Sequence, residues 1–429
     1  MNPVRVLTGI TPSGTPHLGN YVGAIRPTVQ ASRRPGVESF LFLADYHALI
    51  KIDDPARIQR STLEIAASWL AAGLDPEQVT LYRQSDIPEI PELTWLLTCV
   101  TGKGLLNRGH AYKAAVDKNL AAGVDTDADI SAGLFMYPVL MGADILMFNA
   151  HQVPVGRDQV QHIEMARDMA SSFNHRYGPH FELPQAVIED SVATLPGLDG
   201  RKMSKSYDNA IPMFATRAEL QRLVGAILTD SRAPGEPKEV QGSALFQIYQ
   251  AFASADESAA LGRAYAEGIS WAEAKQRVVE RVECEVGPMR ERYQALINDP
   301  ARIEAILLRG AAKARALATP FMGRLRDAVG LRDLRRQAET APKKLSRIAA
   351  PSFKQYREDD GKFHFKLVEP RGRVLLQSLG FESPRAAGEA VRQLQTQGLA
   401  ALGPMREQLA LQPGVSDQEI ALALEQLAA

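Results

Sequence analysis

The sequence predicts an α/β fold: a parallel β-sheet with helices on both faces, followed by a helical domain and a small module of β-strands and a helix. Over the first 200 residues, short apolar runs alternate with amphipathic stretches, which is typical of such sheets. Residues 216–340 are rich in Ala, Leu, Arg and Glu with helical periodicity, which predicts helices. Beyond residue 352, apolar residues alternate between turn residues, which predicts short strands.

Short apolar runs mark the strands of the predicted parallel sheet. Between the second and third of them, residues 57–72 place Ile58, Ile65 and Trp69 on one face of a helix. Open sheets of this kind bind ligands at the carboxyl ends of their strands. The predicted strands are RVLTGI at 5–10, SFLFLAD at 39–45, VTLYRQS at 79–85, VPVG at 153–156 and a last one at 185–188.

The changes in pattern divide the chain into five predicted segments. The last of them opens with a capping box formed by Ser416 and Glu419, which predicts a helix. The segments are the sheet domain 1–206, the helical domain 207–338, a linker 339–352, a β-sheet-plus-helix module 353–400 and a helical tail 401–429.

The module 353–400 has its own turn and cap signals. Asp360 and Arg371 each precede a glycine, and these pairs predict turns between short strands. Ser383 followed by Pro384 predicts a helix start, with Ser as the cap and Pro at the first helical position.

Composition argues for an ordinary globular protein of the cytoplasm. The 429 residues are 45% hydrophobic and 23% charged, with a net charge of −1. Cys99 and Cys284 show no metal-ligand spacing and allow at most one disulfide. The N-terminus lacks the apolar stretch of a signal peptide, and no run approaches the length of a membrane span. Residues 302–357 hold fourteen Lys and Arg against four Asp and Glu, which indicates either a solvated helix face or a surface for a polyanion.

The first strand runs into TPSGTPHLGNYVGAI at 11–25. In an α/β sheet, phosphate groups meet a helix N-terminus at such a strand-to-helix turn. Gly14 and Gly19 would let the backbone approach a nucleotide closely, while His17 and Asn20 can donate hydrogen bonds to it. The alternative is a plain surface loop, since the stretch is neither the dinucleotide fingerprint nor the Walker loop.

An aspartate lies within the apolar stretch LFMYPVLMGADILMF at 134–148. Pro138 predicts the first turn of a helix, which puts Tyr137, Met141 and Asp144 on one face. A buried carboxylate needs a partner, and an indole N–H of a ligand would fit. The alternative is an exposed Asp on an otherwise buried helix.

Two further segments follow predicted strands. In VPVGRDQVQH, Gly156, Asp158 and Gln159 would lie at the carboxyl end of a strand, although Asp158 would equally serve as a helix cap. In KMSKS at 202–206, Lys202 and Lys205 can hold a pyrophosphate leaving group and stabilise its developing charge. The alternative for this loop is a solvated surface.

Together these segments resemble the class I aminoacyl-tRNA synthetases, and among them the tryptophanyl-tRNA synthetase family. PSGTPHLGN is similar to the HIGH signature of that class, and KMSKS matches its second signature in every letter. YPVLMGADIL and VPVGRDQVQH resemble the tryptophan-specific blocks, and GAAKARALA with LRDAVGL resembles the C-terminal helix of the family. The resemblance covers about residues 4–335. It implies a Rossmann-like catalytic domain with a helical tRNA- and anticodon-binding domain.

The resemblance also implies roles for individual residues. Asp144 would accept the indole N–H with Met141 packed on the ring, and Tyr137 and Gln159 would hold the α-amino group. The catalytic set would be His17, Asn20, Lys202 and Lys205. The ATP site would comprise Thr11, Pro12, Ser13, Gly19, Asn20, Gly156, Arg157, Asp158, Val192, Lys202, Met203, Ser204, Lys205 and Ser206.

The sequence departs from the family pattern in a few places. Thr11 stands where the family often has glutamine, and Arg157 where glutamate is common. The family also uses a lysine on ATP, for which Lys113 and Lys118 are both candidates. The module 353–400 lies outside the usual core and looks like a small bacterial domain of no clear function.

The implied activity is that of a tryptophan–tRNA ligase. MgATP and L-tryptophan would give tryptophanyl-adenylate and pyrophosphate, and the aminoacyl group would pass to the 3′ end of tRNA(Trp). No general base is needed because the attacking carboxylate is already ionised; His17, the two lysines and Mg²⁺ would supply positive charge. We further expect a cytoplasmic homodimer without a membrane segment or a protein-bound structural metal.

Three alternatives share parts of this pattern. A tyrosyl-tRNA synthetase has the same fold, but MGADIL and the methionine of KMSKS favour tryptophan. A synthetase-like sensor of tryptophan or tRNA would not need the intact His17, Asn20, Lys202 and Lys205. A nucleotidyltransferase that does not act on tRNA would leave the helical domain unexplained.

Overall fold

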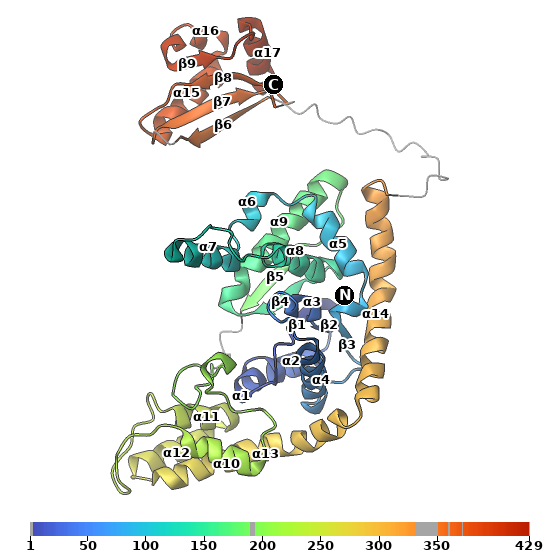
Figure 1. Ribbon diagram of the computed structural model, residues 1–429, viewed down its shortest axis with the longest axis vertical. Coiled ribbons are helices and arrows are strands. Elements are labelled where there is room, and N and C mark those ends of the chain that lie inside the picture. The colour runs from blue at the N-terminus through green and yellow to red at the C-terminus, as the bar shows by residue number, and fades with distance from the viewer. Residues whose placement is uncertain (1–2, 189–193, 332–350, 359–360, 371, 429) are drawn as a thin grey trace. The chain divides into compact units, whose positions relative to one another are not determined.

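The computed structural model describes residues 3–188, 194–331, 351–358, 361–370 and 372–428 (Figure 1). The chain forms two compact units, residues 1–332 and 333–429, which are described separately. Val192, most of the predicted linker 339–352 and the turn residues Asp360 and Arg371 lie outside the described residues. The predicted boundary at residue 206 falls inside the first unit and remains a prediction.

A five-stranded parallel sheet forms the centre of the first unit, in the order β3-β2-β1-β4-β5. Its first two strands pair along their full length, from Val4 opposite Val37 to Ile10 opposite Leu43. The strands predicted from the apolar runs are confirmed. Their bounds are β1 Val4–Ile10, β2 Val37–Leu43, β3 Thr80–Arg83, β4 Gln152–Val155 and β5 Gln185–Ile188.

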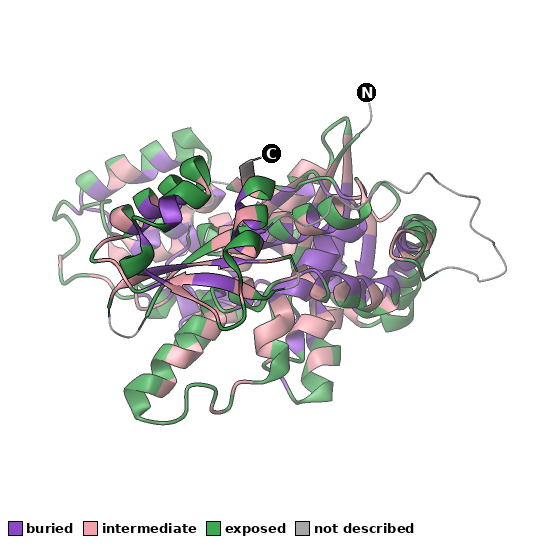
Figure 2. Ribbon diagram, turned by 90° about the horizontal axis from the view of Figure 1, so that it is seen from above, coloured by how far each residue is buried: buried purple, intermediate pink, exposed green. Residues whose placement is uncertain are grey.

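The strand β2 is buried on both faces, as its continuous apolar run predicts. Along β2, Phe40 and Phe42 enter one hydrophobic core, while Leu41 and Leu43 enter the other, because successive side chains of a strand point to opposite faces. Figure 2 colours the chain by burial, with buried residues in purple.

Helices cover the two faces of the sheet and make up the rest of the unit. Short helical turns follow β1 at Tyr21–Ile25, β3 at Gln84–Asp86 and β4 at Arg157–Gln159. The helices are α1 Leu18–Asn20, α2 Arg26–Ser32, α3 Asp45–Ala48, α4 Pro55–Ala71, α5 Glu89–Thr98, α6 Lys103–Leu106, α7 His110–Ala122, α8 Ala132–Met147, α9 Val160–Tyr177, α10 Arg217–Ala226, α11 Ala244–Phe252, α12 Ala255–Ala266, α13 Trp271–Ile297 and α14 Pro300–Ala328.

The long helix α14 passes the edge strand β3 (Figure 1). Gly310 allows this approach, since a Cβ atom there would lie 1.6 Å from the carbonyl oxygen of Leu81. The basic residues of α14 bond to neighbouring segments: Lys313 donates to the Pro76 carbonyl at 3.0 Å, and Arg315 and Arg326 pair with Glu89 and Glu92. Much of the positive charge at 302–328 therefore fixes the helix to the sheet domain rather than facing a polyanion.

The prediction that Pro138 lies in the first helical turn is wrong. Helix α8 begins at Ala132, and the Ser131 hydroxyl caps it by accepting a hydrogen bond from the Leu134 N–H at 3.1 Å. Pro138 consequently sits inside the helix, where its missing N–H leaves the Leu134 carbonyl without its helical donor. The cap at Ser131, and not Pro138, sets the start of the helix, because the helix can accommodate the proline one turn further on.

The second unit is a four-stranded antiparallel sheet in the order β6-β7-β8-β9 with helices packed on it. Ser383 caps α15 as predicted, and the capping box of Ser416 and Glu419 is confirmed. Residues 401–429 contribute both β9 and α17 to this sheet and its core. The elements are β6 Ser352–Arg357, β7 Phe363–Val368, β8 Val374–Ser378, α15 Pro384–Gln397, α16 Leu399–Leu402, β9 Leu409–Leu411 and α17 Asp417–Ala428.

The described part of the chain contains no helix long and apolar enough to cross a membrane. Within the same residues, no group of three or more His, Cys, Asp or Glu side chains is placed to hold a metal ion.

Candidate functional site

A cavity of about 750 Å³ lies at the carboxyl ends of β1, β2 and β4. Thr11 and Ser13 line it from the turn after β1, His47 from α3, and Gly156 from the turn after β4. Helix α8 supplies its predicted face to the same cavity: Tyr137, Met141 and Asp144. The sequence thus correctly predicts that these side chains converge.

Asp144 is fully buried and already has two partners. Its Oδ2 lies 3.0 Å from Nε2 of His47, and the Gln84 amide donates to Oδ1 at 2.8 Å and to Oδ2 at 2.9 Å. The alternative of an exposed aspartate is therefore wrong. Burial raises the pKa of this carboxyl above its usual range, while the bonds from His47 and Gln84 oppose that rise. The carboxylate keeps lone pairs for a further donor from a molecule bound in the cavity.

A chain of hydrogen bonds fixes the orientation of Tyr137 and Gln159. The Gln159 amide donates to Asp158 at 3.0 Å, so the Gln159 carbonyl oxygen faces Nδ1 of His162 at 2.9 Å. Because that oxygen can only accept, Nδ1 carries the proton, and Nε2 of His162 accepts from the Tyr137 hydroxyl at 2.6 Å. The Tyr137 and Gln159 oxygens both retain acceptor capacity for a cationic donor.

His17 forms the cap of α1 rather than a free cation. Its Nδ1 accepts from the Asn20 N–H at 3.2 Å, and the Asn20 side chain accepts from the His17 N–H at 3.1 Å. Burial, and secondly the positive charge of Lys205, lower the pKa of His17 to about 4. The expectation that His17 supplies positive charge at pH 7 is therefore wrong, and its free Nε2–H is a neutral donor.

We expect this lowered pKa to make folding stability depend on pH. Because the folded-state pKa lies below the unfolded value of about 6.5, the contribution of His17 is fully present above pH 6.5 and is lost as pH falls through about 4. The loss should reach up to about 3 kcal/mol in the free energy of unfolding. Urea titrations between these pH values should show a shallower decline for His17→Asn, which retains a capping side chain. If the free energy of unfolding falls equally with pH in the parent protein and in His17→Asn, His17 is not the source of the pH dependence.

The KMSKS loop is organised by a side chain that the sequence analysis does not single out. Asn209 is buried, accepts from the Ser204 N–H at 2.8 Å and donates to the Lys202 carbonyl at 3.2 Å and to Asp199 at 2.6 Å. Gly197 packs directly on this amide, where a Cβ atom would come within 2.3 Å. Asn209 therefore holds the base of the KMSKS loop together through its hydrogen bonds.

Backbone hydrogen bonds join the first signature to the residues that follow the second. Leu18 N–H donates to the Ile211 carbonyl at 2.9 Å, and Met213 N–H donates to the Pro16 carbonyl at 2.9 Å. Lys205 consequently reaches the turn after β1, with its Nζ 3.2 Å from where a Cβ atom on Gly14 would lie. Gly14 has a φ of +138°, which also favours glycine.

The remaining predicted residues fall into three groups. Lys202 and Arg157 line an adjoining cavity of about 480 Å³ that shares Gly156 and Asp158 with the first. Pro12 and Met203 are buried, whereas Ser206 is exposed. Gly19 packs on the His17 ring, and Val192 lies outside the described residues.

Sequence reasoning misses several residues of the site. His47 lies in the helical turn after β2 and Gln84 directly after β3. The predicted strand 79–85 includes Gln84, so its position at a strand end is visible only once the structure ends β3 at Arg83. His162 lies one turn into α9 and carries no comparable local signal. Arg57 donates to the Ser13 carbonyl at 3.1 Å from a helix far along the chain, a contact that only the tertiary structure shows.

The fold and the two joined signatures define a known class of enzyme. Residues 1–286 match the family described as tRNA synthetases class I (W and Y). The chain therefore belongs to this class of tRNA synthetases, as the resemblance predicts.

Similar proteins place the chain more narrowly within the class. It is 67% identical over 390 residues to the tryptophan–tRNA ligase of Xanthomonas campestris pv. campestris, covering 90% of each chain. The tryptophan–tRNA ligase of Xylella fastidiosa is 62% identical over 412 residues, or 95% of each chain. A crystal structure of the Campylobacter jejuni tryptophanyl-tRNA synthetase with ADP and tryptophan matches with a TM-score of 0.70 and 40% identity, over 76% of this chain and 100% of that one. The chain belongs with the tryptophan–tRNA ligases, and the predicted enzyme class is confirmed.

Proposed function

We propose that this chain activates L-tryptophan with ATP and transfers it to tRNA(Trp), using the two adjoining cavities as its amino-acid and nucleotide sites. The observation that carries the proposal is the buried Asp144, whose carboxylate lines a cavity together with the apolar side chains of Leu7, Phe42 and Ile145. Thr11 and Ser13 of the HIGH-like segment line the same cavity. A donor-only, otherwise apolar ring system matches that environment.

The side chains assign an orientation to tryptophan. The indole N–H donates to Asp144 with Met141 against the ring. The α-ammonium donates to the Tyr137 and Gln159 oxygens, which their hydrogen-bond chain leaves available. The carboxylate of the substrate then points away from Asp144 toward the turn after β1.

ATP occupies the region between the turn after β1 and the KMSKS loop. The Nε2–H of His17 and the ammonium groups of Lys202 and Lys205 hold the phosphates, and Lys113 is the better candidate for the additional lysine because it lies one turn from His110, which lines the cavity. The other contacts of the nucleotide are assigned to Thr11, Pro12, Ser13, Gly19, Asn20, Gly156, Arg157, Asp158, Val192, Met203, Ser204 and Ser206.

Magnesium enters this scheme as part of the nucleotide. The ion is held mainly by phosphate oxygens and water, and its charge neutralises the phosphates. The protein residues position the substrate carboxylate for attack on the α-phosphorus, and pyrophosphate leaves against Lys202 and Lys205. In the second step, the 3′-terminal ribose of the tRNA takes the aminoacyl group and AMP leaves.

ATP–pyrophosphate exchange with each amino acid in turn tests this function. We expect exchange with tryptophan alone, because only its side chain joins a donor-only N–H group to an apolar two-ring system, whereas the tyrosine hydroxyl also accepts hydrogen bonds. Exchange with tyrosine instead would overturn the role of Asp144 and retain the fold. The absence of exchange with every amino acid would favour a sensor of tryptophan or tRNA.

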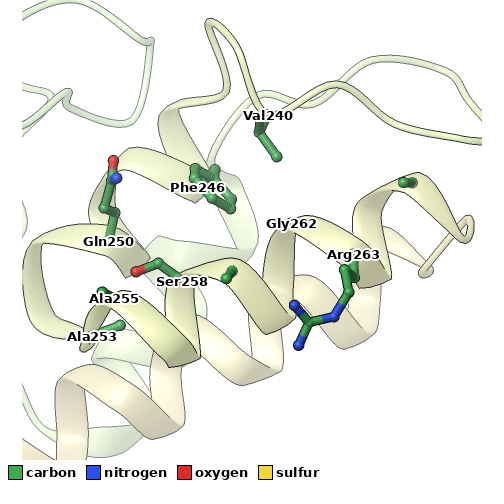
Figure 3. A pocket seen from close by; sticks show the side chains of 10 residues that line it. Val240, Phe246, Gln250, Ala253, Ala255, Ser258, Gly262 and Arg263 are labelled. Atoms are coloured by element: carbon green, nitrogen blue, oxygen red, sulfur yellow. The ribbon is translucent and has the colours of Figure 1, made fainter.

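We assign contacts with the tRNA to the helical region, for which the division at residues 207–338 remains our proposal. A shallow hollow of about 870 Å³ opens between α11 and α12 (Figure 3). Phe246, Gln250 and Arg263 line it and offer a ring, an amide and a cation to a nucleic acid. If α10–α13 bind the tRNA, affinity should fall steeply with salt.

We also propose a cytoplasmic homodimer whose interface includes α5. Trp95 leaves 67% of its surface exposed on that helix, and exposed tryptophans are frequent anchors of interfaces. Trp95→Lys should weaken dimerisation by roughly 30-fold or more, measured by sedimentation equilibrium. The matched control is Leu228→Lys, because Leu228 lies away from α5 and is 73% exposed. An unchanged dimer in Trp95→Lys would exclude this interface.

A further inference from the structure

The sheet of the C-terminal unit presents one face away from its core. Phe365, Leu367 and Leu376 point into the core shared with α15 and α17. The alternate residues of β6 and β7 point the other way, because successive side chains of a strand alternate. This open face carries Lys354, Tyr356, His364, Lys366 and Gln377.

The aromatic part of the open face is held in place by its neighbours. The rings of Tyr356 and His364 stack across β6 and β7, with centroids 5.7 Å apart and planes 23° from parallel. His364 is buried, and its Nδ1 lies 3.1 Å from the Ser378 carbonyl oxygen. The Lys366 ammonium lies 5.1 Å from the centre of the Tyr356 ring. The face therefore combines an ordered ring, only partly buried, with an adjacent cation.

The charges of the open face are arranged unfavourably for an isolated protein. Lys354 and Lys366 lie directly opposite each other in the β6–β7 register, and like charges in such a pair destabilise a sheet. Neither ammonium forms an ion pair within the described residues. Among the described residues, Glu358 is an acidic side chain near this face. It accepts from Gln377 at 3.4 Å, lies 3.6 Å from Nε2 of His364, and follows Tyr356 on the side of the strand away from the lysines. An anion between the two lysines would remove the repulsion.

We propose that this open face binds a single-stranded segment of the tRNA substrate, with a base stacked at Tyr356 and its phosphates on Lys354 and Lys366. Aromatic side chains beside cations on an open sheet are a general means of holding unpaired nucleotides. Overall charge does not drive this binding, because the acidic and basic residues of the unit nearly balance. The Tyr356 ring and the two lysines beside it drive the binding instead. The proposal rests on the proposed function, since tRNA is the RNA that the enzyme must hold.

A similar extension exists in at least one relative. The alignment with the Xylella fastidiosa protein covers 95% of this chain and must include most of the C-terminal unit. The Campylobacter jejuni structure matches 76% of this chain at its full length. The extension is therefore an addition to a complete enzyme, and a second contact with the same tRNA would act by raising its effective concentration.

The test uses the full-length protein and two measurements. Fluorescence anisotropy gives the affinity for the tRNA(Trp) transcript and for a short labelled single-stranded RNA, and ATP–pyrophosphate exchange with tryptophan reports on the catalytic unit without tRNA. The variants are Tyr356→Ala and the double substitution Lys354→Glu with Lys366→Glu. The matched control is Arg385→Glu with Arg392→Glu, which changes the same charge at exposed positions of α15.

We expect both test variants to lose affinity for the two RNAs by about fivefold or more, and the lysine variant to show a smaller salt slope. Exchange and the control should be unchanged. Unaltered RNA affinity in folded Tyr356→Ala and lysine variants would overturn the proposal, as would an equal loss in the arginine control, which would indicate net charge alone. If the parent protein shows no ATP–pyrophosphate exchange, the proposed function is contradicted. The RNA affinities can still be interpreted, because they are measured independently of exchange.

Discussion

Replacing Asp144 with alanine is expected to lower kcat/KM for tryptophan by a hundredfold or more. This corresponds to roughly 3 kcal/mol of transition-state stabilisation. The substitution removes the acceptor for the indole N–H and also leaves the donors of His47 and Gln84 without their partner in a buried site. Steady-state pyrophosphate exchange measures the effect.

The same variant should also lose discrimination. We expect phenylalanine to be rejected because it offers no donor to the acceptor capacity that Asp144 retains beside its bonds from His47 and Gln84, so the ratio of kcat/KM for tryptophan over phenylalanine should fall in Asp144→Ala. Thermal unfolding separates this effect from misfolding. Glu77→Ala is a suitable control, because it removes an exposed carboxylate whose contact is a surface ion pair with Arg309 at 3.7 Å. Kinetics like those of the parent in Asp144→Ala would exclude the assignment of the amino-acid site.

Lys205→Ala is expected to lower kcat of tryptophan activation by about 10²–10³-fold, the usual effect of removing a preorganised charge-stabilising group. Its ammonium lies beside Gly14 at the turn after β1, where we propose that the leaving pyrophosphate binds. KM for tryptophan should change little, because Lys205 does not line the cavity that holds Asp144. Exchange kinetics at saturating ATP and variable tryptophan separate the two parameters.

Arg201→Ala is the matched control for Lys205 within the same loop. The Arg201 guanidinium pairs with Asp199 and lies 4.5 Å from the centre of the Tyr207 ring, on the exposed side. Its removal should alter kcat by no more than a few-fold. If both variants lose activity equally, the loop contributes through its overall structure rather than through a charge at Lys205.

The sequence predicts the sheet and the identity of most site residues because their signals are local. An apolar run of buried strand residues, or a glycine followed by polar residues at a strand end, can be read within ten residues. The partners of Asp144 could not be read in this way, since His47 and Gln84 lie 97 and 60 positions away. Only the parallel order of β2 and β3 brings these strand ends beside α8.

Two local signals predict the wrong detail for physical reasons. Pro138 suits a first helical turn, but the cap at Ser131 starts the helix earlier. From the sequence alone, His17 would be given the ordinary pKa of histidine, whereas burial and Lys205 lower its pKa in the folded protein. In the second unit, β9 is too short to be recognised from three residues, and pairing with β8 stabilises it.

The ring of hydrogen bonds around Asn209 has a consequence for the thermodynamics of turnover. Because Lys202, Ser204 and Asp199 are already fixed on that amide, the base of the KMSKS loop loses its conformational entropy when the protein folds and not at each binding of ATP. We therefore expect the loop to close over the nucleotide as a preformed arm that has little conformational entropy left to lose at closure. Nucleotide capture on such an arm should carry a small entropic penalty, so that both closing and release of pyrophosphate stay fast.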